Sequence, residues 1–119
     1  LDTEDDLFFA RVQYSEGVIL QRNKEEQKAL VKFGEIANYV SDDPRIRNYK
    51  FESMLRMLEI YSRLGQYNLC EELYNRLLAY LEYYSGEIRM RTLFRIEYAY
   101  LKVMEKRNEK QHTSRLYSK

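Results

Sequence analysis

The sequence predicts an all-α fold, and three features support this prediction. Turn-forming residues are scarce, since the 119 residues include only 4 Gly and 1 Pro. Apolar residues recur three and four positions apart over long stretches, which is the spacing of one face of a helix. Single break signals separate these stretches, at Asn23, Asp43, Gly65 and Gly86. Few breaks between long amphipathic stretches indicate a small number of long helices.

The first two helices are expected on either side of a polar stretch at residues 21–27. Apolar and small residues keep a helical spacing over residues 7–20 before it and over residues 29–40 after it. Asn23 tolerates the left-handed backbone conformation that ends many helices. Glu25 suits the positive N-terminal end of the following helix. The first 40 residues are therefore predicted to form a helical hairpin.

Asp43 and Pro44 give the clearest boundary in the chain. Asp43 can cap a helix by accepting a backbone N–H bond, and Pro44 suits the first helical position, where no donor is needed. The third helix is predicted to run from there to Gly65, which ends it by tolerating positive φ. The fourth helix follows at once, with an apolar face that extends from Cys70 to Tyr84.

Gly86 provides the next break, with the acidic Glu87 in the first turn of a fifth helix. This helix is predicted to end near Asn108, and residues 109–119 are predicted to open a sixth helix. Because the chain begins at Leu1 and stops inside a basic, helix-like segment, we expect it to be a piece of a longer protein.

Six expected helices in three hairpins invite a comparison of the chain with itself, because similarity at a fixed offset is the signature of repeat proteins. Shifting the fourth-helix pattern upstream by about 41 residues places Ala29 at Cys70 and Phe33 at Tyr74. The first two hairpins then each have a small residue followed four positions later by a large aromatic residue. A downstream shift of about 43 residues places Asn108 at the Gly65 turn, Thr113 at the small site and Tyr117 at the aromatic site.

The best-preserved unit has an aromatic residue late in its first helix, glycine at the turn and an aromatic residue opening its second helix. The small and large aromatic pair of Cys70 and Tyr74 follows. This pattern resembles the tetratricopeptide repeat. The offset exceeds the roughly 34 residues of that repeat, and Met54 stands where a tryptophan-type residue is expected. Both departures suggest longer helices than the standard repeat has.

The resemblance implies a right-handed superhelix of antiparallel helical hairpins in one domain over residues 1–119. Its repeats would cover about 7–40, 44–84 and 87–119, the last incomplete. The long helices and the Tyr-, Lys- and Glu-rich composition are also similar to the sensory domains of bacterial peptide-pheromone regulators of the Rap and PlcR type. In such proteins the repeat domain binds a short secreted peptide and relays this to a DNA-binding or response-regulator-binding part.

In this family the first helix of each hairpin lines a concave groove. The resemblance assigns eight residues to that surface, namely Arg11, Tyr14, Arg22, Arg56, Glu59, Arg63, Tyr98 and Lys102. Planar guanidinium groups and aromatic faces suit an extended peptide, because arginine can hold carboxylates or main-chain carbonyls. The alternative is that these are ordinary solvated charges on amphipathic helices.

The charge and the cysteine count limit the other function classes. Lys and Arg number 20 against 19 Asp and Glu, which gives a net charge of +1 and no general preference for nucleic acid or an anionic membrane. Cys70 is the single cysteine and His112 the single histidine, so neither an internal disulfide nor a zinc set is expected. No apolar run reaches the roughly 18 residues of a membrane span. A cytoplasmic location fits this composition.

We therefore expect a binding module for a peptide or partner protein, with a regulatory role and without cofactor, metal or catalytic activity. A structural adaptor or homodimerising scaffold is the main alternative, and an enzyme fragment is a third. Cys70 occupies the small packing site of its hairpin, so a buried thiol is favoured over a redox centre. His112 lies among polar residues and is interpreted as a solvated side chain.

Overall fold

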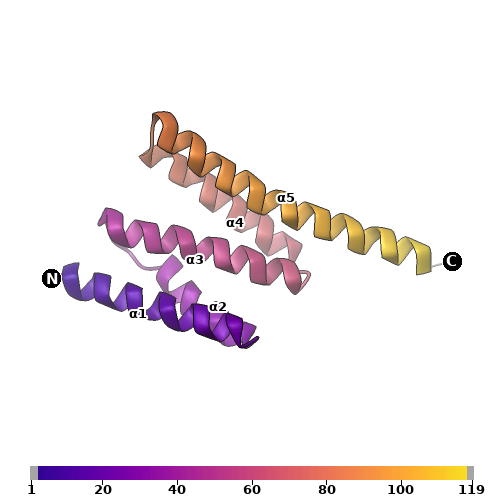
Figure 1. Ribbon diagram of the computed structural model, residues 1–119, viewed down its shortest axis with the longest axis horizontal. Helices are drawn as coiled ribbons and strands as arrows, with labels where there is room; N and C mark the ends of the chain where they lie inside the picture. Colours follow the sequence, from indigo (N-terminus) through magenta and orange to yellow (C-terminus); the bar gives the residue numbers. More distant parts are fainter. Residues whose placement is uncertain (1–2, 118–119) are drawn as a thin grey trace. The chain divides into compact units, whose positions relative to one another are not determined.

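The computed structural model describes residues 3–117, with side chains over residues 4–111. The described part of the chain is all-α and contains no strand, which confirms the predicted fold class (Figure 1). Its elements are α1 (Thr3–Arg22), α2 (Glu26–Ala37), α3 (Pro44–Arg63), α4 (Tyr67–Ala79), the 3₁₀-helix η1 (Tyr80–Tyr83) and α5 (Gly86–Tyr117). They form two compact units, Leu1–Met57 and Leu58–Lys119, and α3 contributes residues to both.

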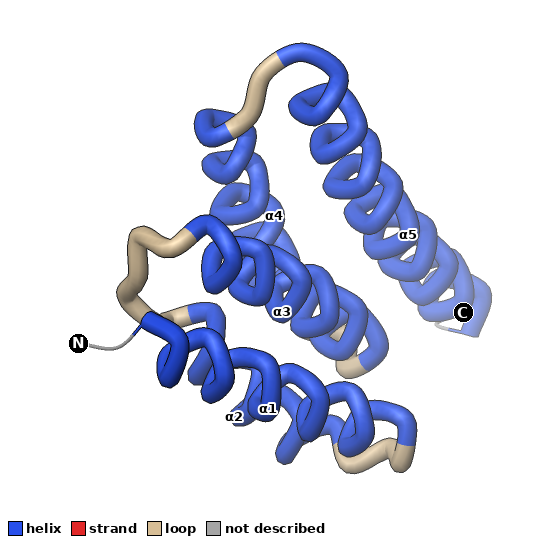
Figure 2. Tube along the Cα trace, turned by 60° about the vertical axis from the view of Figure 1, so that its left-hand side comes forward, coloured by secondary structure: helices blue, strands red, loops and turns tan. Residues whose placement is uncertain are grey.

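In the first unit, α1 and α2 form a hairpin and lie side by side (Figure 2). Ala29, Phe33 and Ile36 of α2 are fully buried, and Ala10 and Gly17 of α1 are buried as well. A Cβ atom on Gly17 would lie only 2.6 Å from the ring of Phe33. Because Gly17 has no side chain, the Phe33 ring can lie directly against the α1 backbone.

The turn between α1 and α2 differs from the sequence prediction in one detail. The residue with positive φ is Lys24, at 62°, and Asn23 is not the left-handed residue. The N–H of Glu25 donates to the carbonyl of Leu20 at 2.9 Å, and that of Lys24 donates to Gln21 at 3.1 Å. These two bonds satisfy carbonyls at the end of α1 and fix the left-handed position one residue beyond Asn23.

The turn between α3 and α4 repeats this arrangement. Gly65 has a φ of 74°, as predicted, and its N–H donates to the carbonyl of Ser62 at 3.2 Å. The N–H of Gln66 donates to Tyr61 at 2.9 Å. The starts of α1 and α3, their ends, and the starts of α2 and α4 each differ by 41 positions. The helix bounds of the two hairpins therefore follow the offset that the sequence predicts, while a superhelical arrangement stays a prediction.

The loop between α2 and α3 is fixed at both ends. Tyr39 donates its hydroxyl proton to the carboxylate of Asp6, and this hydrogen bond raises the pKa of Tyr39. Asp43 accepts the backbone N–H of Arg45 at 2.8 Å through Oδ1. The predicted cap of α3 at Asp43 and Pro44 is confirmed. The Arg45 side chain hydrogen-bonds the same carboxylate and is the main reason that the pKa of Asp43 is lowered.

In the second unit, α5 lies beside α4 (Figures 1 and 2). Ile96 and Val103 of α5 are buried, as are Cys70 and Leu77 of α4. Gly86 lies at the predicted break and has a φ of 58°, but it is the first residue of α5 and does not end α4. The chain instead leaves α4 through η1 and two non-helical residues.

The prediction that the fifth helix ends near Asn108 is wrong. α5 continues through this residue to Tyr117, so a separate sixth helix is not formed within the described residues. Asparagine is only a mild helix breaker, and it is surrounded here by good helix formers such as Lys106, Arg107 and Glu109. Neither glycine nor proline stands nearby to force a turn. The predicted small site Thr113 and aromatic site Tyr117 of the third repeat therefore continue α5.

Candidate functional site

A polar cluster in the first unit joins two of the residues predicted to bind a ligand. Arg56 of α3 donates from Nε to the hydroxyl of Tyr14 on α1 at 3.2 Å. Its Nη1 donates to Oε1 of Gln21 at 3.4 Å. The guanidinium carbon also lies 5.9 Å from the centroid of the Tyr14 ring. We call Tyr14, Gln21 and Arg56 the Arg56 cluster.

Aromatic neighbours hold the tyrosine of the Arg56 cluster in place. The Tyr14 ring lies 5.7 Å from the ring of Phe33 and 5.8 Å from that of Tyr49, measured between centroids. Phe33 is fully buried, so one side of Tyr14 is anchored to the hairpin core. The position of the hydroxyl that accepts from Arg56 is thereby fixed by packing within this unit.

The Arg56 cluster offers guanidinium and aromatic surface for recognition. A guanidinium group has five N–H donors in a planar fork, and the bonds to Tyr14 and Gln21 engage two of them. Carboxylates and main-chain carbonyls are the acceptors that match this geometry. Arg56 is half-buried, so part of its side chain is exposed to solvent.

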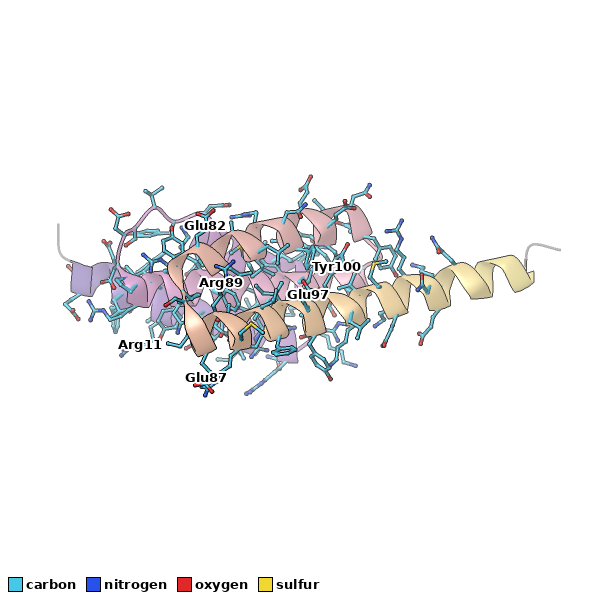
Figure 3. All side chains as sticks on the ribbon, turned by 90° about the horizontal axis from the view of Figure 1, so that it is seen from above. Arg11, Glu82, Glu87, Arg89, Glu97 and Tyr100 are labelled. Carbon is cyan, nitrogen blue, oxygen red and sulfur yellow. The ribbon has the colours of Figure 1, made fainter. Side chains whose placement is uncertain are left out.

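The remaining predicted residues of the first unit, Arg11 and Arg22, are exposed on α1. Figure 3 shows the Arg11 side chain extending away from the ribbon. Neither Arg11 nor Arg22 takes part in the contacts that Arg56 makes with Tyr14 and Gln21.

In the second unit, Lys102 places Nζ 4.7 Å from the centroid of the Tyr98 ring, one turn earlier on α5. Both side chains are exposed. Glu59 and Arg63 lie one turn apart at the end of α3 and are exposed too. The structure thus brings together Tyr14 with Arg56 and Tyr98 with Lys102. A groove that includes all eight predicted residues stays a prediction.

A tyrosine cluster between α4 and α5 was not predicted from the sequence. The rings of Tyr74 and Tyr100 stack with their centroids 4.0 Å apart and their planes inclined by 14°. The Tyr74 hydroxyl donates to the Glu97 carboxylate, and this bond is the main cause that raises the pKa of Tyr74 to about 12. In Figure 3, Glu97 and Tyr100 lie close together along α5. The sequence marks Tyr74 as a packing residue but gives no signal for its partners.

An open recess lies where α4 begins, in the second unit. It has a volume of about 630 Å³ and is lined by residues 65–69 together with Arg107, Lys110 and Gln111 of α5. Arg107 lies over the ring of Tyr67, with its guanidinium carbon 5.9 Å from the centroid. The two cations give the recess a positive character. The sequence could not indicate it, since the prediction of a turn at Asn108 separated these residues.

Cys70 is buried at the centre of the second hairpin, with Sγ 3.7 Å from the carbonyl oxygen of Leu58. Burial raises the pKa of its thiol to about 11, so the reactive thiolate is disfavoured near neutral pH. This environment supports its interpretation as a packing residue.

Over the described residues, His, Cys, Asp and Glu side chains do not gather in groups of three or more that could hold a metal ion. A search of the same part of the chain finds no helix that is both long and apolar enough to cross a membrane. Comparison with models of known protein families gives no match, and neither does comparison with curated protein sequences or with solved structures. The tetratricopeptide resemblance therefore depends on residue spacing alone.

Proposed function

We propose that this chain is a helical binding module that recognises a peptide or a partner protein through the Arg56 cluster. The observation that carries the proposal is the Arg56 guanidinium group, which Tyr14 and Gln21 position on a side chain that is only half-buried. A pre-positioned donor loses less conformational entropy on binding than a free surface arginine does. A ligand carboxylate or main-chain carbonyl would bind this group.

The wider proposal is that the module is the sensory or regulatory part of a bacterial, cytoplasmic regulator. Its support is the spacing of the tetratricopeptide type and the composition similar to that of peptide-pheromone regulators. A ligand that contacts several hairpins at once would favour one arrangement of them over another, and a linked domain could respond to that shift.

An array of short peptides with varied sequences, followed by isothermal titration with those that bind, tests this function. We expect Arg56→Ala to weaken binding by about tenfold or more, as is common for an arginine at the centre of an interface. Tyr14→Phe, which keeps the ring and removes the hydroxyl, should weaken it less. Arg76→Ala on α4 serves as the control, because it removes an exposed arginine of the other unit. Peptides that bind the Arg56→Ala variant as tightly as the parent chain would refute the assignment.

A structural adaptor or homodimer is the second candidate function. It is favoured by a row of exposed apolar side chains on α5, among them Phe94 at 68% exposure. Sedimentation velocity over rising protein concentration tests self-association. A single monomeric species at all concentrations would argue against the homodimer.

A further inference from the structure

The exposed row on α5 consists of Met90, Phe94, Tyr98 and Leu101, which are between 52% and 68% exposed. Their spacings of four, four and three positions place all of them on one face of the helix. We call this row the α5 stripe. The buried residues Ile96 and Val103 lie on a different face, which belongs to the core of the second unit. α5 therefore has two apolar faces, of which one is exposed.

The other two hairpins indicate what such a face accommodates. By the predicted sequence offset of 43 positions, Leu101 corresponds to Leu58 on α3, and by the offset of 41 positions Leu58 corresponds to Gly17 on α1. The second helix of the hairpin covers both of these positions. The Phe33 ring of α2 lies against Gly17, and Cys70 of α4 contacts the Leu58 carbonyl.

Leu101, at the corresponding position of α5, is 55% exposed and is not covered by a second helix within the described residues. The two earlier hairpins turn back at Lys24 and Gly65, but α5 continues as a helix past Asn108. No second helix of this hairpin therefore returns along α5 within the described residues. An α-helix is the element that the equivalent faces bind in the same chain.

Charge indicates which helix would fit. Arg91, Arg95 and Lys102 follow one another at four and seven positions, so they form a basic row along one side of the α5 stripe. Arg91 also lies 3.7 Å from Glu87 in an ion pair whose side chains are both largely exposed. Glu97, on the other side, accepts the Tyr74 hydroxyl. Acidic side chains on an incoming helix would match the basic row.

We propose that the α5 stripe is a docking site for an amphipathic helix of a partner protein that carries acidic residues along one side. This inference rests on the proposed role as a binding module, but it concerns a surface other than the Arg56 cluster. The partner helix would lie along α5 as α2 lies along α1. A second copy of this chain fits less well, because antiparallel pairing of two α5 helices brings each basic row against its equivalent.

Two synthetic helical peptides provide the probe. Both carry leucines at helical spacing on one face, while the flanking positions are glutamate in one peptide and lysine in the other. In fluorescence anisotropy at low salt, we expect the acidic peptide to bind at least tenfold more tightly than the basic one. Phe94→Ser with Leu101→Ser should abolish this binding. Ile88→Ser is the matched control, because Ile88 is 60% exposed on α5 but lies outside the stripe.

Reversing two charges of the basic row distinguishes a lost docking site from a misfolded protein. Arg91→Glu with Lys102→Glu should make the chain prefer the basic peptide, which a misfolded protein would not do. Equal binding of both peptides by the parent chain would overturn the proposal, as would unchanged binding after Phe94→Ser with Leu101→Ser. A dimer in sedimentation that Leu101→Ser dissociates would overturn it in favour of a second copy. Arg56→Ala should leave acidic-peptide binding unchanged, so failure of the Arg56 assignment is distinguishable from failure here.

Discussion

Gly17 determines how closely α1 and α2 pack at their centre. A Cβ atom there would lie 2.6 Å from the ring of Phe33, which is fully buried in a close-packed interior. We predict that Gly17→Ala lowers the free energy of unfolding by about 1–3 kcal/mol through overpacking, as measured by urea denaturation.

Gly34 provides the matched control for this substitution, because it lies in the interior of α2 with ordinary φ. The nearest atom to a Cβ atom there is Cε of Met57, at 4.0 Å. Gly34→Ala should therefore stabilise the chain by about 0.5–1 kcal/mol, because alanine restricts the unfolded backbone. If both variants shift stability in the same direction, the packing account of Gly17 is wrong.

The thiol of Cys70 should react slowly in the folded protein. It is buried, and its pKa is raised to about 11. With a thiol-reactive dye at neutral pH, we expect labelling at least roughly tenfold slower than for a free cysteine, and fast labelling once denaturant unfolds the chain. Fast labelling of the native state would mean that the second hairpin opens readily.

The turns after α1 and α3 have the same hydrogen bonds but different residues at the left-handed position. Lys24 adopts a φ of 62° at a steric cost that Gly65, at 74°, does not have. We predict that Lys24→Gly raises the free energy of unfolding by about 1 kcal/mol and that Gly65→Ala lowers it by about 1–2 kcal/mol. Thermal unfolding followed by circular dichroism measures both, and Asn23→Gly is the control beside the left-handed position.

The helix bounds show which local signals the sequence carries reliably. The cap at Asp43 and the glycine turn at Gly65 were predicted correctly, because each depends on the conformation of a few adjacent residues. The prediction of a turn at Asn108 was wrong. It depended on the alignment of Asn108 with Gly65, whereas the residues around Asn108 have high helix propensity and continue α5.

At the scale of the whole molecule, the tyrosine cluster predicts how the free energy of unfolding depends on pH under alkaline conditions. Tyr74 has a pKa of about 12 against an ordinary value of 10.0, mainly through its hydrogen bond to Glu97. A raised pKa means that folding favours the protonated phenol. The stabilisation is therefore complete below about pH 10 and is lost as the pH rises through about 12.

Glu97→Gln should bring the pKa of Tyr74 back toward 10.0 and move the alkaline loss of stability to lower pH. Tyrosinate absorbance against pH reports the titration, and chemical denaturation at several pH values reports the stability. Glu105→Gln, which removes an exposed carboxylate from the same helix, is the control. An unchanged titration in the Glu97→Gln variant would contradict the assigned cause.

The sequence by itself determined the all-α fold, most helix bounds and the 41-residue offset between the first two hairpins. These depend on local backbone preferences and on apolar spacing, which are written into consecutive residues. The contact of Lys102 with the Tyr98 ring is also local, since residues four apart on a helix are neighbours. Only the tertiary structure decided that Arg56 bonds Tyr14 and Gln21, and that Tyr74 bonds Glu97. These partners are 23 or more positions apart, so their meeting depends on how the helices pack and on which way each side chain points.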